Sequence, residues 1–441
     1  MTRSSTVARL APLASAQFMT AVDFDIVFVA LPEIGRRLGF STHALQSVVS
    51  AYTVVFGGFL LLGGRAADRL GARRTFALGL ALFGAASLAA GLATGPAWLV
   101  VARAVQGFGA ALLTPSTLKL VTTGFPAGPP RDRAMAVWGA AGASGAAAGA
   151  LGGGVLTGLL GWEAVFFVNV PLVAAALLAT PVLPRDEAVR AGRFDLPGAL
   201  LATAGATLVV FGLVTGPDAG WLALRGAGAV LAGALVLGGW LLVESRSRDP
   251  LVPASLFANR HVLAAIVVVF VFMGAVGTEY YLFTTYLQDV LGYSPLRAGV
   301  AFLPLGVCSA VASARAVPPV LHRFGVRTAL VAGMTGVAAS MAALALGMPS
   351  GNYWAVLPGV LLWGASAGLA FPPVFVAVTT GVPAERHGVA SALASTAQYL
   401  GSAVGLAALV AVSGAPAPGL WAAALVTVVG AVLGAVLLRG R

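Results

Sequence analysis

The sequence predicts an all-α integral membrane protein, and three observations support this fold class. Mean hydropathy is +0.94 over 441 residues, with 59% of residues hydrophobic and only 9% charged. A soluble globular domain has an apolar share nearer one half. The apolar residues form runs of about 20, the length of a membrane-spanning helix, and the charged residues gather in the short breaks between runs. The chain has room for many spanning helices and for no large soluble domain.

Charged and Pro/Gly-rich breaks divide the apolar sequence into fourteen predicted spans. They cover residues 10–33, 44–65, 75–94, 97–120, 134–158, 164–182, 196–215, 223–242, 262–288, 298–318, 328–348, 354–381, 388–412 and 420–438. The first span is interpreted as uncleaved, because only about four apolar residues precede Ala14-Ser15-Ala16, too few for a signal peptide. An even number of spans predicts that both termini lie on the same side.

The basic residues predict which side that is. With cytoplasmic termini, four of the 26 basic residues lie in outer loops and three within spans or at their ends, which leaves 19 on the cytoplasmic side. This bias is typical of membrane proteins. The tryptophans agree, since five of them fall at predicted outer ends of spans: Trp98, Trp162, Trp221, Trp354 and Trp421. The net charge of +11 therefore reflects topology, and its scatter through short loops argues against a nucleic-acid partner.

Two linkers, 184–195 and 244–259, bracket the seventh and eighth spans and leave six spans on either side. The predicted organisation is an N-terminal six-helix bundle (1–183), a linker with two additional transmembrane helices (184–255) and a C-terminal six-helix bundle (256–441). Residues 314–327 follow the second span of the second half and echo residues 64–74 of the first, which indicates a duplication. His322 stands there roughly where the first copy has Asp68.

Residues 64–74 read Gly-Arg-Ala-Ala-Asp-Arg-Leu-Gly-Ala-Arg-Arg, with five charges and two glycines between two apolar stretches. Such a turn cannot lie in lipid, and its arginines favour the cytoplasmic surface. The pattern resembles the cytoplasmic loop signature of the major facilitator superfamily of transporters. The resemblance implies a major facilitator fold and a conformational latch in which Asp68 binds the N-terminus of the thirteenth span. The predicted latch residues are Gly64, Asp68, Arg69, Gly71 and Arg74.

Further motifs resemble the fourteen-span drug:proton antiporters of that superfamily. Residues 103–111 resemble the family's second signature, and residues 22–32 (VDFDIVFVALP) resemble its first-span signature L-D-x-T-I-V-N-V-A-L-P. Residues 161–171 and 385–401 resemble two more of its motifs, so the likeness covers nearly the whole chain. It implies no bound cofactor and a proton gradient as the source of energy.

The resemblance implies that Asp23 couples transport to protons together with Arg103, and a second acid, Asp25, is a further candidate. Burial favours the neutral form of a carboxyl, whereas a nearby arginine favours its charged form. An acid that gains and loses Arg103 would therefore switch its proton affinity. Two alternatives stay open: Arg103 snorkels to the outer surface, or Asp23 and Arg103 form a static pair that only fixes helix packing. Asp23 and Asp25 point about 200° apart, so they cannot share one face.

The chain departs from the first-span and fifth-span signatures at three positions. Asp25 replaces a small hydroxyl residue, Phe28 an asparagine, and Ala150 the proline of the fifth-span antiporter signature. That span keeps its glycines, and we expect close helix packing at Gly145, Gly149, Gly153 and Gly154. Because the proline is missing, antiport is less firmly predicted than by a full match.

One acid belongs to no signature. Glu279 lies in the ninth span, and an acid within a membrane span is by default a functional-site hypothesis. With Tyr280, it would bind a cationic, aromatic substrate; the other predicted substrate-binding residues are Gln106, Gln398 and Tyr399. The alternative is an acid near the outer end of its span that simply meets water.

The sequence thus predicts a monomeric exporter in the bacterial plasma membrane that moves amphipathic drugs, or an antibiotic made by the cell, in exchange for protons by alternating access. A proton-coupled symporter that imports a small nutrient is the nearest alternative. A membrane-embedded enzyme is a more distant one, because no nucleophile–base or metal constellation is apparent. No phosphate-binding G-x-x-x-x-G-K-[ST] motif occurs, and the four histidines are too far apart to predict a metal site.

Overall fold

The computed structural model describes residues 3–126, 129–184, 196–220, 222–246, 254–383, 387–412 and 416–438, and every regular element in these ranges is helical. The chain divides into two compact units. The first unit comprises Met1–Ser41, Ala51–Thr203 and Pro295–Val300, and the second comprises Thr42–Ser50, Ala204–Ser294 and Ala301–Arg441. The predicted division at 183 and 255 stays a prediction.

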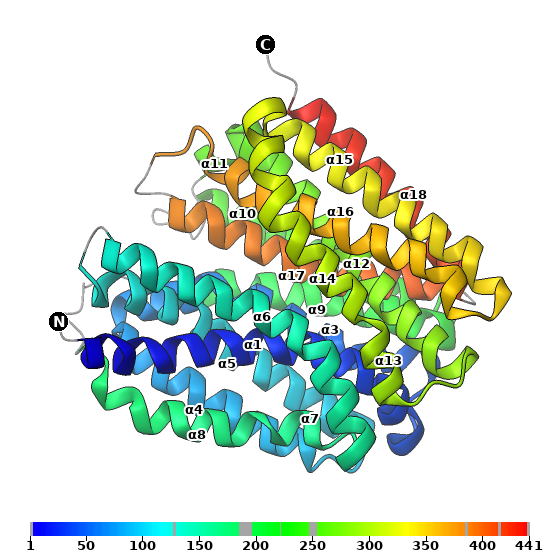
Figure 1. Ribbon diagram of the computed structural model, residues 1–441, viewed down its shortest axis with the longest axis horizontal. Coiled ribbons are helices and arrows are strands. Elements are labelled where there is room, and N and C mark those ends of the chain that lie inside the picture. Colours follow the sequence, from blue (N-terminus) through cyan, green and yellow to red (C-terminus); the bar gives the residue numbers. More distant parts are fainter. Residues whose placement is uncertain are drawn as a thin grey trace. The chain divides into compact units, whose positions relative to one another are not determined.

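The first unit is built mainly from helices α1 to α8 (Figure 1). Their bounds are α1 Arg3–Leu38, α2 Thr42–Leu45, α3 Ser47–Arg69, α4 Ala72–Gly91, α5 Pro96–Gly124, α6 Pro129–Leu160, α7 Ala164–Phe167 and α8 Asn169–Ala179, with η1 at Thr180–Val182. The short α2 and the first residues of α3 group with the second unit. In the first unit α1 packs on α5, α6 and α8, and α4 packs on α5 and α8.

The second unit holds most of the remaining helices. They are α9 Leu196–Ala219, η2 Leu224–Gly228, α10 Ala229–Arg246, α11 Ala254–Ala258, α12 Arg260–Thr285, η3 Tyr286–Val290, α13 Pro295–Ala301, α14 Leu303–Val311, η4 Ala312–Ala316, α15 Val317–Gly347, η5 Met348–Ser350, α16 Tyr353–Thr379, α17 His387–Val412 and α18 Pro416–Leu437. The start of α9, to Thr203, and most of α13 group with the first unit. In the second unit α12 packs on α16, α17 and α18, and α15 packs on α16 and α18.

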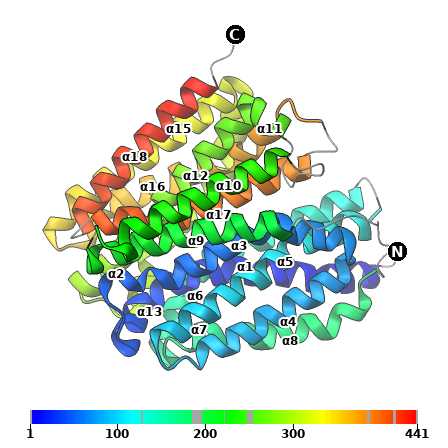
Figure 2. The same cartoon turned by 180° about the vertical axis from the view of Figure 1, so that it is seen from behind.

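The two units therefore repeat one packing pattern, in which α1, α4, α5, α6 and α8 correspond to α12, α15, α16, α17 and α18. Figures 1 and 2 show α4 beside α8 and, equally, α15 beside α18. The positions of two glycines support the correspondence. Gly71 (φ 99°) precedes α4, and Gly325 (φ 77°) breaks α15, both in the left-handed region that favours glycine. The duplication predicted from residues 314–327 has this physical counterpart.

Helix starts follow ordinary capping chemistry. Pro96 opens α5 directly after Gly95, a position where the missing N–H is not needed. The Asn259 side chain accepts the backbone N–H of His261 at the start of α12, and Asn352 accepts that of Trp354 at the start of α16. These caps fix where the long apolar helices of the second unit begin.

Eleven helices in the described ranges are long and apolar enough to cross a membrane. The all-α fold class is confirmed, whereas the count of fourteen spans stays a prediction. Apolar side chains also cover the outside of the protein, as lipid contact requires: Leu178 is 83% and Leu235 77% exposed.

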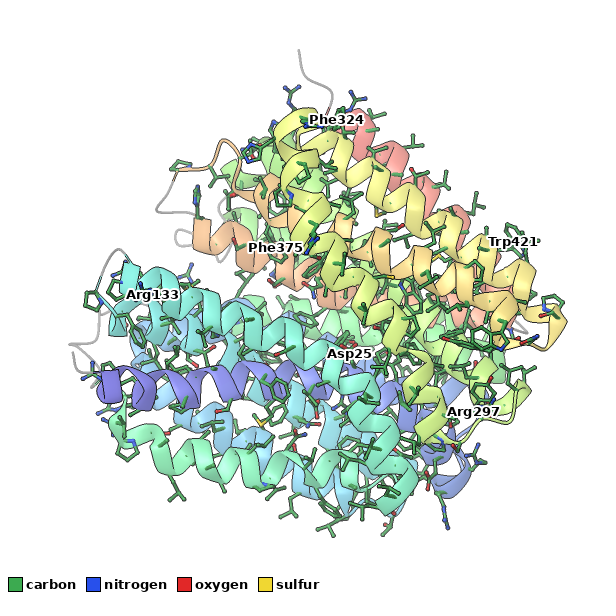
Figure 3. All side chains as sticks on the ribbon, in the orientation of Figure 1. Asp25, Arg133, Arg297, Phe324, Phe375 and Trp421 are labelled. Carbon is green, nitrogen blue, oxygen red and sulfur yellow. The ribbon has the colours of Figure 1, made fainter. Side chains whose placement is uncertain are left out.

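The tryptophans agree only in part with the predicted interfacial positions. Trp98, Trp354 and Trp421 are exposed, and Trp421 projects from α18 in Figure 3. Trp162 differs, because it is 3% exposed and packs edge-on against Phe166. Trp221 and the predicted motif residues Glu385 and Arg386 lie outside the described residues.

Candidate functional site

A fully buried polar network occupies the interior of the first unit. Asp23 on α1 and Arg103 on α5 form its centre, with Arg103 Nη1 2.7 Å from Asp23 Oδ2. Their side chains are 0% and 1% exposed. Arg103 therefore does not snorkel to the surface: its charge is neutralised inside the unit, which is the arrangement a buried arginine requires.

Two amides complete the coordination of the Asp23 carboxylate. Gln106 Nε2 and Asn169 Nδ2 donate to Asp23 Oδ1 at 2.7 and 2.8 Å, so Oδ1 accepts two hydrogen bonds and Oδ2 one. Gln106 Oε1 accepts a hydrogen bond from Arg103 (2.7 Å), and Gln106 Nε2 also donates to Ser87 Oγ (2.8 Å). A charged group with this many partners is well compensated for its burial.

Aromatic contacts close the network on the side of the arginine. The Arg103 guanidinium carbon lies 4.3 Å from the ring centroid of Tyr52 and 5.8 Å from that of Phe166, a cation–π arrangement. The network thus joins α1, α3, α4, α5, α7 and α8 through side chains that are at most 1% exposed. A rearrangement at Asp23 would therefore affect six elements at once.

The sequence alone points to part of this network. It singles out Asp23, Arg103 and Gln106, and the structure brings all three together. It misses Ser87 and Tyr52, and it marks Asn169 only as part of a motif. A usable signal exists, since a buried polar side chain must find a hydrogen-bond partner, and Ser87 and Asn169 are polar residues inside apolar runs.

Asp25 has a different environment from Asp23. It lies on the face of α1 that packs on α6 and is 7% exposed (labelled in Figure 3). A Cβ on Gly149 would come within 2.9 Å of the Asp25 Cβ, so glycine is what makes room for this acid. Among the described residues Asp25 makes no hydrogen bond or ion pair. The predicted divergence of the two acids is what the structure shows.

The glycines of α6 lie against α1, where we expected close packing. A Cβ on Gly145, Gly149 or Gly153 would lie 2.6, 2.9 or 2.6 Å from a backbone carbonyl oxygen of α1. Gly154 instead faces Pro295 and Gly299 of α13. These glycines allow backbone-to-backbone contact that any side chain would prevent.

The loop predicted to act as a latch has an internal partner. Asp68 Oδ1 accepts a hydrogen bond from Lys119 Nζ at 2.8 Å, and the same ammonium group donates to the Ala67 carbonyl oxygen at 2.9 Å. Asp68 is 68% exposed. Gly64 ends its apolar run without close contacts, and Arg69 and Arg74 lie on either side of the Gly71 turn. The predicted contact of Asp68 with α17 stays a prediction.

In the second unit Glu279, on α12, is 0% exposed, and its Oε1 lies 3.0 Å from Ser340 Oγ on α15. Glu279 thus does not meet water at the end of its span, which was the alternative. The neighbouring Tyr280 points elsewhere: it stacks on Phe302 (5.2 Å, 7°) and meets Trp363 edge-on (4.7 Å). The two predicted substrate residues therefore do not converge. Gln398 and Tyr399 are half-buried on α17.

Within the described ranges, no group of three His, Cys, Asp or Glu side chains could hold a metal ion. What the fold presents instead is a repeated helical unit, many apolar spans and a buried ion-paired network within them. These features define a multi-pass membrane transporter.

The particular family follows from comparison with known proteins. The family model described as Major Facilitator Superfamily matches residues 13–406, and the chain belongs to this superfamily. It is therefore a membrane transporter and not an enzyme. The fold agrees: a peptide transporter POT crystallised with sulfate superposes with a TM-score of 0.74 at 18% identity, over 98% of this chain and 93% of that one.

Relatives of higher identity have names that concern antibiotics. The puromycin resistance protein pur8 of Streptomyces alboniger is 40% identical over 92% of this chain and 81% of its own length. The cephamycin export protein CmcT of Amycolatopsis lactamdurans is 38% identical over 92% and 84%. The tetracenomycin C resistance and export protein of Streptomyces glaucescens is 37% identical over 91% and 74%.

Proposed function

We propose that this transporter exports amphipathic antibiotics, foreign or made by the cell itself, across the bacterial plasma membrane in exchange for protons. The observation that carries the proposal is its similarity, over about nine-tenths of the chain, to proteins named for the resistance to, or export of, puromycin, cephamycin and tetracenomycin C. These compounds differ in chemistry. A shared scaffold with a broad apolar binding surface accounts for that range better than one tight polar pocket.

The proposed coupling residue is Asp23. In the arrangement described, Arg103 and two amides satisfy its carboxylate inside one unit. Alternating access moves helices against each other, and a movement of α1 against α5 by a few ångströms would break the ion pair. A buried carboxylate that loses its cation takes up a proton, because a charge alone in an apolar interior is very unfavourable. Uptake and release would then follow the conformational cycle.

Two alternatives compete with this mechanism. The hydrogen bonds of the network favour a static role for Asp23 and Arg103 in packing, because both charged groups already have partners. In that case Asp25, which has none among the described residues, is the better candidate for coupling. A nutrient symporter is the second alternative, since Ala150 stands where the antiporter signature has proline.

For substrate contact we propose Tyr280, with Gln398 and Tyr399. All three are half-buried, and Tyr280 continues an aromatic group with Phe302 and Trp363 that suits flat or apolar drug moieties. Gln106 and Glu279 were predicted for the same role. Both are 0% exposed, and Gln106 is already bound to Asp23. We therefore assign Gln106 to the Asp23 network and do not place Glu279 at the substrate site.

We further propose fourteen spans, cytoplasmic termini and a monomer. The span count is supported by the eleven candidates, since one of them, Pro295–Ser350, is 56 residues long and is broken at Gly325. At 1.5 Å per residue it is long enough for two crossings of a core about 30 Å thick. Two shorter apolar helices, Ala148–Leu160 and Leu200–Gly216, bring the count to fourteen. The arginine bias of the loops supports the orientation.

The test is transport in proteoliposomes under an imposed pH gradient, with puromycin, cephamycin and tetracenomycin C as the panel. We expect the wild type to move at least one of them uphill, in the direction opposite to the proton flow. Asp23→Asn should abolish gradient-driven transport, and Asp25→Asn serves as the matched variant. Uphill transport by Asp23→Asn at the wild-type rate would overturn the coupling assignment. Movement in the same direction as protons would overturn export.

A further inference from the structure

The third helix of each unit carries the same pair of hydroxyl residues. Thr75 on α4 and Thr328 on α15 each follow an arginine, and each Oγ1 bonds the carbonyl oxygen four residues earlier, at 2.8 and 2.9 Å. Twelve residues after each threonine comes a serine, Ser87 (75 to 87) and Ser340 (328 to 340). Both serines are 0% exposed. Ser340 therefore lies within one residue of the position that corresponds to Ser87, which belongs to the Asp23 network.

The fourth helices also match, 257 residues apart. Gly107 and Gly364 (107 to 364) both press against the backbone of the second helix of their unit, at the carbonyl oxygens of Tyr52 and Leu305. Pro115 and Pro372 (115 to 372) stand at the same spacing. The glycine contacts and the prolines therefore establish which positions are equivalent: each residue of α5 corresponds to the residue 257 positions later in α16.

This register shows which polar side chains of the first unit are absent from the second unit. Position 103 corresponds to Val360 and position 106 to Trp363, so an arginine and a glutamine have become apolar side chains, both 0% exposed. An acid nevertheless remains on the first helix, where Glu279 faces Ser340. Glycine contacts with α17 place Glu279 about one turn further along α12 than Asp23 lies along α1, on the same face.

No cation replaces the missing arginine among the described residues. The titratable side chains on elements packed against α12 are Tyr353 on α16, His387 and Tyr399 on α17, Tyr286 and Asp289 on η3, and His322, Arg323 and Arg327 on α15; α18 has none. None is within hydrogen-bond or ion-pair distance of Glu279. Arg327 is thirteen residues from Ser340 along α15, about 20 Å, and Arg260 is nineteen residues from Glu279 along α12, about 28 Å.

The number of hydrogens available for hydrogen bonding indicates the protonation state of Glu279. Ser340 Oγ lies 2.7 Å from the Val337 carbonyl oxygen and 3.0 Å from Glu279 Oε1. A hydroxyl has one hydrogen, and a carbonyl oxygen can only accept. If the hydroxyl donates over the shorter distance, to Val337, the contact with Glu279 needs a hydrogen from the carboxyl. Glu279 Oε2 has no partner in the described part of the chain, which is costly for a carboxylate and tolerable for a neutral acid.

We propose that Glu279 is a proton-binding site of the second unit, a neutral carboxylic acid that donates its hydrogen to Ser340. It is the counterpart of the ion-paired Asp23, with the positive charge of Arg103 replaced by a bound proton. Its part in transport rests on the proposed function, whereas its protonation does not. The site releases its proton when α12 and α15 move apart and water reaches the carboxyl.

Infrared spectroscopy of the full chain in lipid nanodiscs tests the proposal. Near neutral pH, the difference spectrum of wild type minus Glu279→Gln should contain one carboxylic-acid C=O stretching band, which is present in the wild type and absent from the variant. Asp23→Asn is the matched control and should keep that band. Loss of a carboxylate band in place of an acid band would overturn the proposal.

A second variant tests whether Glu279 is protonated even if Glu279→Gln fails to fold. Ser340→Ala removes the partner of the carboxyl, and a carboxylic acid with fewer hydrogen bonds has a stiffer C=O bond. Its band should shift to higher wavenumber without being lost, and an unmoved band would overturn the assignment. Because no readout here depends on drug transport, failure of export in proteoliposomes remains a separate result.

Discussion

The two units share one helical framework and differ in what they bury on it. In the first, the acid of the leading helix is held by Arg103, Gln106 and Asn169. In the second, the corresponding acid faces Ser340 and no cation within the described ranges. The glycine contacts between helices are nevertheless alike. Backbone packing thus fixes the framework, while the polar chemistry inside each unit can change independently of it.

Replacing Arg103, the buried cation that the second unit lacks among its described residues, should cause the largest loss of stability. Arg103→Met leaves the Asp23 carboxylate buried without its cation, and breaking a buried pair typically costs about 3–5 kcal/mol. We expect poor folding or a large fall in the thermal unfolding midpoint in detergent. Combining it with Asp23→Asn should restore much of the loss. If the single and double variants were equally unstable, the ion pair would not be the cause.

Substitutions of Asn169 on α8 and Thr427 on α18 compare how much the polar side chains of these two equivalent helices contribute to stability. Asn169→Leu removes a hydrogen bond to a charged group, worth about 1.5–3 kcal/mol. Thr427 bonds its own helix at Ala423 and has only a long contact, 3.7 Å, with the sulfur of Met341. Thr427→Val should therefore cost less than about 1 kcal/mol. Equal losses in thermal stability would show that the two sites are more alike than their contacts suggest.

The glycines should behave alike in both units. Gly107→Ala and Gly364→Ala each place a methyl group against a carbonyl oxygen of the neighbouring helix, so each should destabilise by about 1–3 kcal/mol. Gly152→Ala is the control, because nothing lies within 4 Å of its Cβ position and alanine favours helix. Thermal unfolding of the three variants checks this. A strong effect in one unit only would contradict the shared framework.

The smallest effect is expected at the surface. Lys119→Met breaks the contact with Asp68, which is 68% exposed, and exposed ion pairs contribute about 0–1 kcal/mol. We expect nearly unchanged thermal stability. Asp68→Asn should behave in the same way in unfolding but slow transport if Asp68 acts as a latch. A large loss of stability in either variant would mean that the pair is structural.

More of the fold than of the candidate site could be predicted from the sequence. Apolar runs and the loop at 64–74 lead to an all-α transporter, and the signatures point to Asp23, Arg103 and Gln106. Sequence reasoning misses Ser87 and Tyr52 because a serine and a tyrosine in an apolar run fit many roles. Only the crossing of helices brings Ser87 to Gln106 and Tyr52 to Arg103. Glu279 stands out as an acid in a span, but its partner Ser340 is 61 residues away. Two predicted spans also merge into Pro295–Ser350, since Gly325 turns the chain without a loop.

Lys119 is the only lysine in the sequence, and its ammonium group is occupied by Asp68 and by the end of α3. An amine-reactive dye therefore has one side-chain target in the whole protein. As long as Asp68 holds that amine, the reaction is slow; once Asp68 turns to another partner, the amine is released and labels faster. The transporter thus carries a built-in chemical reporter, and the rate at which a single lysine is modified would follow the position of the loop through the cycle.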